Sequence, residues 1–207
     1  MLEKLQKELI KYGEIAGSKG YSPGISGNIS ARLEDKIIIT SSGSANGFLT
    51  EEDFSVIDMD GNFVEGNPKP SSERFLHVEF YKKRPDVNSV FHLHSPYLTA
   101  FAASGCALEE KVSPEIIYCF KEIPLAPYAI PGSKELVDKT SILFKDYDIV
   151  LMQNHGVVAG ANTIKQVYLN LELAEEYAKT ILFTKLLDGA KILASEEVEK
   201  ILLLRNS

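Results

Sequence analysis

The segment from Asn88 to Ser95 reads NSVFHLHS and places two of the chain's four histidines one residue apart. Alternate side chains of a β-strand point to the same face, so His92 and His94 share a face of the predicted strand. Two imidazoles in this arrangement can ligate one metal ion. They can also line a half-buried sheet surface, each hydrogen-bonded to a neighbour. The pair by itself leaves both interpretations open.

A third histidine follows an apolar run. His155 comes directly after a strand predicted at residues 147–153, and Gly156 behind it allows the backbone to turn sharply. Strand ends face the loops, where functional side chains concentrate. With His92 and His94, this residue completes a set of three, the number of protein ligands in a catalytic zinc site that keeps one position open. The alternative is an ordinary loop histidine.

The segment KPSSERFLH places Glu73 behind two serines, at the start of a helix predicted for residues 71–83. Ser71 or Ser72 can cap this helix, and a glutamate in its first turn complements the helix dipole. The same groups can bind an anion through N–H groups and hydroxyls, with Glu73 beside them as a base. We interpret His77, one turn further on, as a packing residue because the other three histidines already form a set.

Two short segments rich in glycine and serine, SPGISGNIS at 22–30 and ITSSG at 39–43, lie at predicted strand ends. Such segments turn the chain, and they can also form nests of N–H groups that cradle a phosphate. Neither matches the P-loop or the dinucleotide fingerprint, so nucleotide binding is not indicated.

The composition is that of a globular protein. With 207 residues, 44% hydrophobic and 25% charged, the chain is expected to form a single domain over residues 1–207. The net charge of −7 argues against general binding to nucleic acid or to an anionic membrane surface. It leaves room for a small anionic substrate, because a few N–H groups and one local cation suffice for a phosphate.

Cysteine usage and the N-terminus indicate a cytoplasmic location. Cys106 and Cys119 have no C-x-x-C spacing and are expected to be reduced thiols. The N-terminal segment has the pattern of a charged amphipathic helix rather than a signal peptide, and no apolar run approaches membrane-spanning length.

Strands and helices alternate along the sequence, with two hairpins early on. Local patterns predict a helix at 2–18, a hairpin at 28–40 turning at Glu34-Asp35, a hairpin at 54–66 turning at Asp60-Gly61, the helix at 71–83, strands at 87–94 and 147–153, and a final helix from a capping box at Thr163-x-x-Gln166 to about residue 187. This mixture predicts an α/β or α+β sheet with helices packed on it, including antiparallel strand pairs.

Five motifs taken together carry a family resemblance. SGNIS, TSSG, KPSSE, HLHS and QNHG, in this order and at these intervals, resemble the class II aldolase/adducin-head family, and are most similar to the L-fuculose-1-phosphate aldolases within it. The resemblance extends from the segment at 22–30 to the final long helix. It implies an α/β fold of three layers, with a largely antiparallel central sheet flanked by helices. It also implies a homotetramer with active sites at subunit interfaces.

The resemblance also implies roles for individual residues. His92, His94 and His155 are expected to ligate one Zn²⁺ per subunit, with Glu73 as the acid/base, able to coordinate zinc when no substrate is bound. The substrate phosphate is expected to be held by residues from the three glycine and serine segments: Gly27, Asn28, Ser42, Gly43, Ser71 and Ser72.

The reaction implied is retro-aldol cleavage of a ketose 1-phosphate to dihydroxyacetone phosphate and a small aldehyde. Zinc would act as a Lewis acid towards the negative charge that bond cleavage leaves. Glu73 would move the proton at the enediolate carbon. We expect partial burial to raise its pKa for this task, with the opposing pull of zinc deciding its protonation state.

The sequence departs from the fuculose-phosphate aldolases where they handle the aldehyde. Those enzymes use tyrosines from a neighbouring subunit, but the mid-chain position falls near Ser113 here, with Tyr118 five residues on, and the tail KILLLRNS has no tyrosine. The aldehyde is therefore left open among lactaldehyde, acetaldehyde and glycolaldehyde.

Other functions remain as alternatives. A pentulose-5-phosphate 4-epimerase or a methylthioribulose-1-phosphate dehydratase would use the same metal site with a different outcome. A non-catalytic adducin-like module need not retain the histidines or Glu73, and this chain has all four. A structural zinc site would usually have four protein ligands and favour cysteine.

Overall fold

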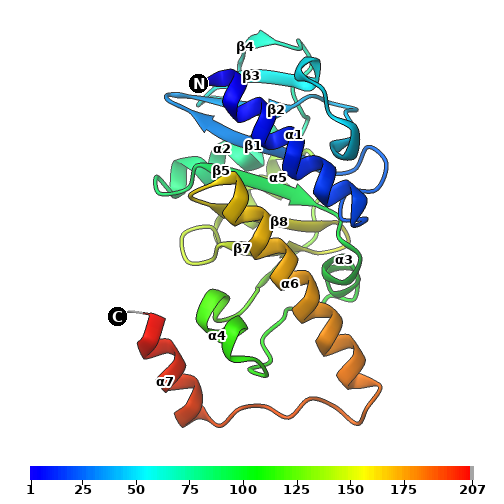
Figure 1. Cartoon of the computed structure of the whole chain (residues 1–207), viewed down its shortest axis with the longest axis vertical. Coiled ribbons are helices and arrows are strands. Elements are labelled where there is room, and N and C mark those ends of the chain that lie inside the picture. Colours follow the sequence, from blue (N-terminus) through cyan, green and yellow to red (C-terminus); the bar gives the residue numbers. More distant parts are fainter. Residues whose placement is uncertain (206–207) are drawn as a thin grey trace.

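The computed structural model describes residues 1–205 (Figure 1). Within them, eight strands form one sheet in the order β4-β3-β2-β1-β5-β8-β7-β6, and every neighbouring pair is antiparallel except β6 with β7. The strands are β1 Asn28–Leu33, β2 Lys36–Thr40, β3 Phe54–Asp58, β4 Phe63–Gly66, β5 Ser89–Leu93, β6 Leu125–Ala126, β7 Ile149–Met152 and β8 Gly156–Ala161. The prediction of one domain over 1–207 stays a prediction, and residues 206–207 lie outside the described part.

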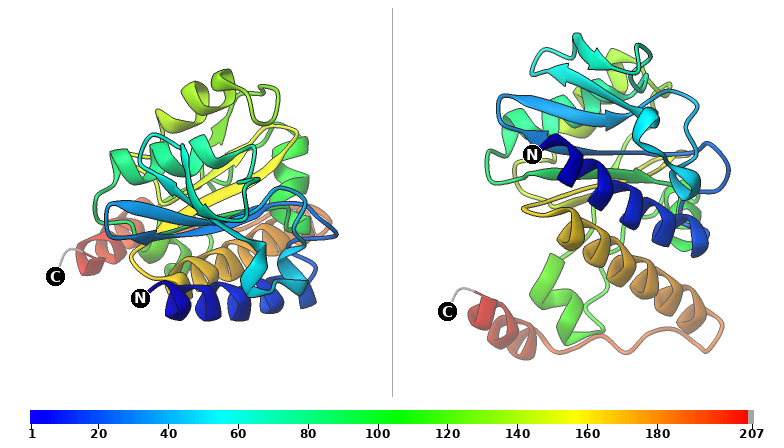
Figure 2. Two further views of the ribbon diagram at one scale, coloured as in Figure 1. Left: turned by 90° about the horizontal axis from the view of Figure 1, so that it is seen from above. Right: turned by 45° about the horizontal axis from the view of Figure 1, so that its top comes forward.

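The helices cover both faces of the sheet. They are α1 Leu2–Ser18, α2 Arg74–Lys83, α3 Pro96–Ala103, α4 Pro114–Phe120, α5 Lys134–Ser141, α6 Ile164–Lys185 and α7 Ser195–Arg205, with short 3-10 helices η1 Asn46–Phe48 and η2 Glu51–Asp53. In Figure 2 (left), α1 and α6 lie on one side of the sheet and α2 and α5 on the other. No helix within residues 1–205 has the length and apolar character needed to cross a membrane.

Strand alternation explains why the sheet has two apolar faces. In β5, Phe91 and Leu93 belong to the core under α1 and α6, whereas Val90 belongs to the core under α2 and α5. His92 therefore faces the α2 side, because successive residues of a strand point to opposite faces. The expected three-layer α/β fold with a largely antiparallel sheet is confirmed.

Most elements with strong local signals are present. The helix predicted at 2–18 is α1, and both predicted hairpins form as β1–β2 and β3–β4. Glu34 and Gly61 have φ angles of 57° and 82°, the positive values that tight hairpin turns require. The strands predicted at 87–94 and 147–153 form as the shorter β5 and β7.

The final helix begins at the predicted cap but forms only half of the capping box. The Thr163 hydroxyl accepts a hydrogen bond from the Gln166 backbone N–H at 3.1 Å. The Gln166 side chain donates to Asn170 at 2.7 Å instead of returning to the backbone of Thr163. The helix, α6, ends at Lys185, two residues before the predicted end.

The helix predicted at 71–83 begins three residues later than predicted, so its predicted start is wrong. The residues before it pair with the end of β2: Ser41 forms an isolated bridge with Pro70, and the Ser71 N–H donates to the Thr40 carbonyl at 3.3 Å. This pairing holds Ser71 and the adjacent Ser72 at the sheet. The helix α2 therefore begins at Arg74, and neither of these two serines is its cap. Glu73 takes the N-cap position, and its own N–H donates to the Ser71 hydroxyl at 3.2 Å.

A buried carboxylate that local patterns do not indicate fixes the start of α3. Glu175 of α6 is 3% exposed, and its carboxylate accepts hydrogen bonds from the Ser95 hydroxyl at 2.8 Å and from the N–H groups of Tyr97 and Leu98 at 2.7 and 2.9 Å. These N–H groups lie at the helix start, where they have no partner inside the helix. Because α3 follows His94 directly, this contact also anchors the chain behind that histidine.

We predict that Glu175→Gln lowers the free energy of unfolding by about 2–4 kcal/mol, because one amide oxygen replaces two oxygens that accept three hydrogen bonds. The measurement is urea unfolding followed by circular dichroism. The matched control is Glu176→Gln, the next residue on α6, whose carboxylate pairs with Lys179 on the surface; it should change stability by less than about 0.5 kcal/mol. Equal effects of the two substitutions would contradict the anchoring role.

Candidate active site

The antiparallel order of the central strands brings five chain segments to one edge of the sheet. The start of β1, the end of β2, the end of β5 and the turn between β7 and β8 all lie at this edge, and the residues before α2 pair with the end of β2. In the register, Asn28 of β1 lies beside His92, and Val158 of β8 lies on its other side. Each predicted site segment is therefore at the same edge.

Three histidines converge there. His92 is in β5, His94 follows it, and His155 lies in the turn between β7 and β8. The Nε2 atoms of His92 and His94 are 3.1 Å apart, and the ligand atoms of all three residues lie within 4.8 Å of one another. This spacing suits three ligands of one metal ion.

Local backbone geometry directs His155 towards the other two. Asn154 has a φ of 56°, the left-handed conformation that asparagine tolerates better than most residues. A Cβ on Gly156 would lie 2.5 Å from the Leu93 carbonyl oxygen and 2.9 Å from the His94 ring. Only glycine allows β8 to begin this close to the end of β5.

The orientation of His92 leaves one nitrogen available for a metal. Its Nδ1 lies 3.0 Å from the carbonyl oxygen of Val157, which only accepts, so Nδ1 carries the proton and donates. Nε2, which faces the other two histidines, carries a proton when it pairs with Glu73 and offers its lone pair to a metal once that proton has left. A backbone acceptor behind a ligating imidazole is the usual outer contact of a metal site.

Glu73, at the N-cap of α2, lies beside the three histidines. Its Oε2 lies 3.2 Å from Nε2 of His92, and its Oε1 lies 3.4 Å from Nε2 of His155. The Asn28 side chain donates a hydrogen bond to Oε2 at 3.0 Å. The structure thus brings together the four side chains that the sequence singled out.

The charges at the site set the protonation of these groups. Burial alone raises the pKa of Glu73, but His92, His155 and the Asn28 hydrogen bond oppose it and hold that pKa well below its usual value. The raised pKa expected for Glu73 is therefore wrong for this geometry, because the imidazoles stabilise the carboxylate more than burial penalises it. In His92 burial lowers the pKa, and Glu73 outweighs it, so the net direction is upward.

The other two histidines of the triad are held neutral. Burial, and then the nearby His92, lower the pKa of His94 to about 3 and that of His155 to about 4. Both are uncharged at neutral pH, the state in which an imidazole binds a metal.

The segments expected to hold phosphate have free backbone donors. The N–H groups of Gly27, Gly43 and Ser72 donate to no acceptor within residues 1–205. Gly27 has a φ of 73°, and a Cβ there would lie 2.5 Å from the His92 carbonyl oxygen, so no other residue fits. Ser42 and Ser72 are exposed, whereas Ser71 is buried.

Asn28 is placed differently from the other residues expected at the phosphate. Its side chain is 6% exposed, donates to Glu73, and has its Oδ1 only 2.6 Å from Nε2 of His77. The side chain is thus engaged within the protein. His77 is fully buried, as a packing residue would be, but both of its ring nitrogens lie within hydrogen-bond distance of polar side chains.

The chain is similar in sequence to a known protein family. The sequence profile of the class II aldolase and adducin N-terminal domain matches residues 7–182. The chain belongs to this family.

The relatives are similar over most of their length. The chain is 36% identical over 203 residues to a 5-deoxy-D-ribulose 1-phosphate aldolase of Bacillus thuringiensis serovar kurstaki, covering 97% of this chain and 95% of that protein. It is 35% identical over 181 residues to an L-fuculose phosphate aldolase of Methanocaldococcus jannaschii, covering 87% and 97%. The solved structure of an L-fuculose 1-phosphate aldolase superposes with a TM-score of 0.91 at 30% identity, covering 99% and 97%. The chain is therefore an enzyme of the class II aldolase family.

The family depends on a metal, and the residues of this class II aldolase fit one. Nδ1 of His155 and Oε1 of Glu73 are buried and without a hydrogen-bond partner within residues 1–205. The triad offers three imidazole nitrogens, and the Glu73 oxygens lie 3.2 Å from that of His92 and 3.4 Å from that of His155. Such a set can hold a metal ion.

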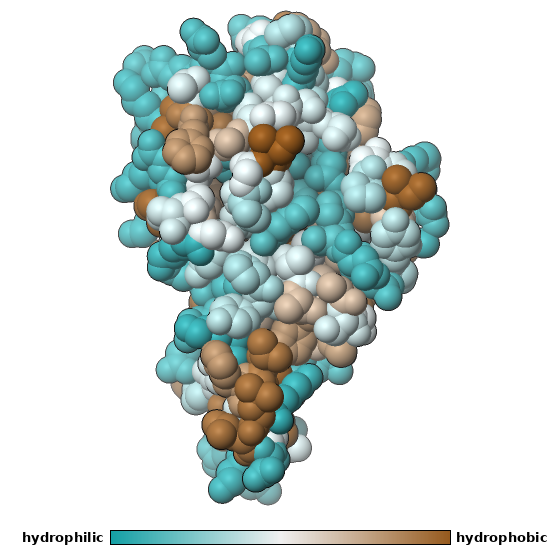
Figure 3. All heavy atoms as spheres, turned by 90° about the vertical axis from the view of Figure 1, so that its right-hand side faces the viewer, coloured by the Kyte–Doolittle hydropathy of each residue, from teal (hydrophilic) through white to brown (hydrophobic). Residues whose placement is uncertain are grey.

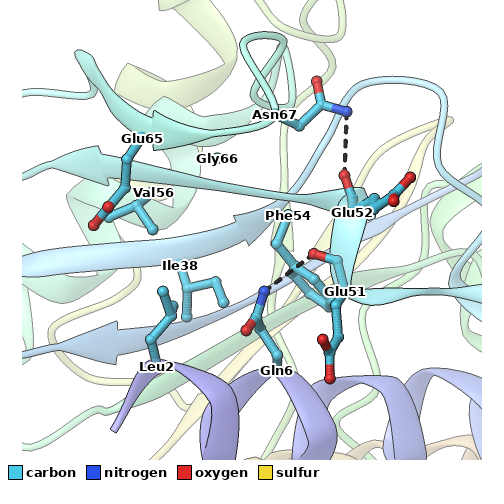
Figure 4. Close-up of a pocket in the computed structure, with 10 residues that line it drawn as sticks. All are labelled: Leu2, Gln6, Ile38, Glu51, Glu52, Phe54, Val56, Glu65, Gly66 and Asn67. Carbon is cyan, nitrogen blue, oxygen red and sulfur yellow. Dashed lines mark hydrogen bonds between the residues drawn. The ribbon is translucent and has the colours of Figure 1, made fainter.

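A pocket elsewhere on this class II aldolase is a poor candidate for the site. The pocket in Figure 4 lies between α1 and strands β2 to β4, and the acidic residues Glu51, Glu52 and Glu65 are among those that line it. None of the three histidines is among its lining residues. Three carboxylates would repel a phosphorylated substrate.

Tyr118, the mid-chain tyrosine nearest to the expected position, is half-exposed on α4. This helix packs on α6 and α7, on the face of the sheet opposite to His92. Within a single chain, Tyr118 is therefore not part of the group around Glu73.

We predict that His155→Ala abolishes stoichiometric metal binding, because two imidazoles remain where three are needed to hold the ion. Metal content after dialysis, measured by atomic emission, checks this. The matched control is His77→Gln, which alters the one histidine outside the triad and should retain the metal. Full metal content in the His155 variant would show that the triad is not the metal site.

Proposed function

We propose that this enzyme is a zinc-dependent class II aldolase that reversibly cleaves a deoxy-ketose 1-phosphate to dihydroxyacetone phosphate and a small aldehyde. L-Fuculose 1-phosphate and 5-deoxy-D-ribulose 1-phosphate, the substrates named for its relatives, are the first candidates. The observation that carries the proposal is the convergence of the three histidines and Glu73 beside three segments with free backbone N–H groups.

Zinc is the metal that the ligands favour. Three imidazoles and one open position are the ligand set of catalytic zinc sites. When bound, zinc supplies Lewis-acid stabilisation of the negative charge that develops on the sugar oxygens. The three neutral ligands leave the charge of the ion undiminished, which suits this role better than thiolates would.

Glu73 moves the proton. Cleavage of the C3–C4 bond transfers the C4 hydroxyl proton to the ionised Glu73 carboxylate, turns C4 into the aldehyde carbon and leaves the bonding electron pair on C3, giving the enediolate of dihydroxyacetone phosphate. Glu73 then delivers this proton to C3, and in the reverse direction it removes a proton from C3 and returns one to the new C4 oxygen. Its depressed pKa keeps it ionised and ready to accept that proton when condensation begins.

The phosphate site would use backbone donors. The N–H groups of Gly27, Gly43 and Ser72 are available, and the Ser42 and Ser72 hydroxyls are exposed near them. N–H groups in such turns bind anions through their partial positive charges. Ser71 and the backbone of Asn28 belong to the same segments, and we include them in the proposed phosphate site.

Decarboxylation of a 3-oxo acid phosphate is a second candidate. The chain is 36% identical over 199 residues to a 3-oxo-tetronate 4-phosphate decarboxylase of Haemophilus influenzae. Loss of carbon dioxide from such an acid leaves the same enediolate and no aldehyde. This reaction needs no group to handle an aldehyde, and Tyr118, the nearest mid-chain tyrosine, lies on α4 away from Glu73.

A homotetramer with its active sites at subunit interfaces is part of the proposal, as is a cytoplasmic location. The end of α6 and the residues after it expose an apolar surface: Leu182, Phe183, Leu186 and Leu187. Figure 3 shows apolar side chains gathered over this part of the molecule. An exposed cluster of this kind marks a protein–protein contact more often than a solvated surface.

We predict that the zinc-loaded enzyme condenses dihydroxyacetone phosphate with lactaldehyde or acetaldehyde to a ketose 1-phosphate, detected by NMR. Glu73→Gln should retain zinc and lower kcat about 10²- to 10⁴-fold, because the amide cannot accept the proton. No condensation by the zinc-loaded wild type, together with carbon dioxide release from 3-oxo-tetronate 4-phosphate, would favour the decarboxylase. Full activity of the Glu73 variant would contradict the assigned base.

We predict that the wild type elutes with the mass of four chains in light scattering. Substituting aspartate for both Leu186 and Leu187, each 75% exposed, should shift it to smaller species with lower activity. The matched control is Ile142→Asp, because Ile142 is 70% exposed at the end of α5 in the opposite layer. A monomeric wild type, or dissociation by the control alone, would contradict this interface.

A further inference from the structure

A line of buried polar side chains runs from α2 through β1 to the carboxylate of Glu73. The Tyr81 hydroxyl lies 2.7 Å from the Ser30 hydroxyl, which lies 2.7 Å from Nδ1 of His77. Nε2 of His77 lies 2.6 Å from Oδ1 of Asn28, whose Nδ2 is 3.0 Å from Oε2 of Glu73. Of these side chains, the proposed reaction uses only that of Glu73.

The line is closed to solvent. Ser30 and His77 are fully buried, Tyr81 is 1% exposed and Asn28 is 6% exposed. Water therefore cannot substitute for a missing partner without a change in packing, and each polar group depends on its neighbours.

The direction of every hydrogen bond follows from the end at Glu73. An ionised carboxylate only accepts, so the Asn28 amide must present its NH₂ group to Glu73 and its oxygen to His77. That oxygen also only accepts, so the proton of the His77 ring is on Nε2. Nδ1 of His77 then accepts from the Ser30 hydroxyl, and Ser30 accepts from Tyr81.

The protonation of His77 agrees with this direction. Burial, and then the charge of His92, lower the pKa of His77 to about 3, so its ring is neutral and carries one proton. A neutral imidazole can donate on one side and accept on the other, as the line of contacts requires.

The two oxygens of Glu73 are consequently not equivalent. Oε2 accepts from Asn28 and faces His92. Oε1 is buried, lies 3.4 Å from Nε2 of His155, and has no hydrogen-bond partner within residues 1–205. Oε2 is fixed by its hydrogen bond from Asn28, whereas Oε1 has no hydrogen bond to break before it exchanges a proton.

We propose that His77 is a positioning residue that fixes the Asn28 amide, so that Asn28 holds Oε2 of Glu73 and leaves Oε1 as the oxygen that transfers the proton. This inference rests on the proposed function of Glu73 as the acid/base. In this proposal the Asn28 side chain orients the Glu73 carboxylate, while the Asn28 backbone remains available to the substrate phosphate.

The test compares two substitutions of His77. His77→Leu removes both hydrogen bonds, whereas His77→Gln offers an amide group at about the position of Nε2, which can donate to Asn28. The matched control is Phe80→Leu, because Phe80 is equally buried on α2 and stacks on Phe144 rather than on the polar line. The readouts are zinc content, KM and kcat, and the exchange of the carbon-bound proton of dihydroxyacetone phosphate in D₂O.

For His77→Leu we expect full zinc content and an unchanged KM for the phosphate substrate. Its kcat and proton-exchange rate should fall about 10- to 100-fold, the usual effect of removing an outer partner of a reactive group. His77→Gln should recover most of this loss, and Phe80→Leu should show none of it. Undiminished exchange in His77→Leu, or the same loss in Phe80→Leu, would overturn the positioning role. A raised KM with kcat retained would assign Asn28 to the phosphate instead.

A second measurement is independent of activity. In ¹⁵N NMR spectra of the wild type, the His77 ring should be neutral with its proton on Nε2 throughout the neutral pH range. Protonation on Nδ1 would overturn the inference even in an active enzyme. If the wild type exchanges no proton of dihydroxyacetone phosphate while the His77 tautomer is as expected, the proposed reaction fails and the geometric assignment stands.

Discussion

The placement of β5 between β1 and β8 is the constraint on which the site depends. Its register sets His92 beside Asn28 on one side and beside Val158 on the other. Because both pairings are antiparallel, the end of β5 meets the starts of its two neighbours at one edge. A slip of one residue would turn His92 to the opposite face, into the apolar core under α1 and α6. The register therefore decides whether the three histidines can converge.

Close packing at this edge explains why glycines flank the reactive groups. A Cβ on Gly27 would press against the His92 carbonyl oxygen, and one on Gly156 would press against the Leu93 carbonyl oxygen. The backbones of β1 and β8 thus approach β5 more closely than any side chain allows. The glycines of SGN and NHG thus allow this close approach, in addition to turning the chain.

Buried charge at the site is balanced by neighbouring imidazole and amide groups. Burial of the Glu73 carboxylate without partners would cost desolvation free energy, and the imidazoles and the Asn28 amide compensate for this cost. The same logic applies to Glu175, which offsets its burial by accepting three hydrogen bonds at the start of α3. Each carboxylate therefore both depends on the surrounding fold and restrains a segment next to one of the three clustered histidines.

The sequence by itself determined the features that depend on neighbours along the chain. Alternation placed His92 and His94 on one face, hairpin turns were recognisable at Glu34-Asp35 and Asp60-Gly61, and periodicity marked α1 and α6. It missed β8, whose residues GVVAGA are small and apolar on both faces and so show no alternation. Only the tertiary structure decided that α2 begins at Arg74 and that Asn28 contacts both Glu73 and His77. The partners in these contacts lie 45 and 49 residues apart, so strand register and packing, rather than any local pattern, bring them together.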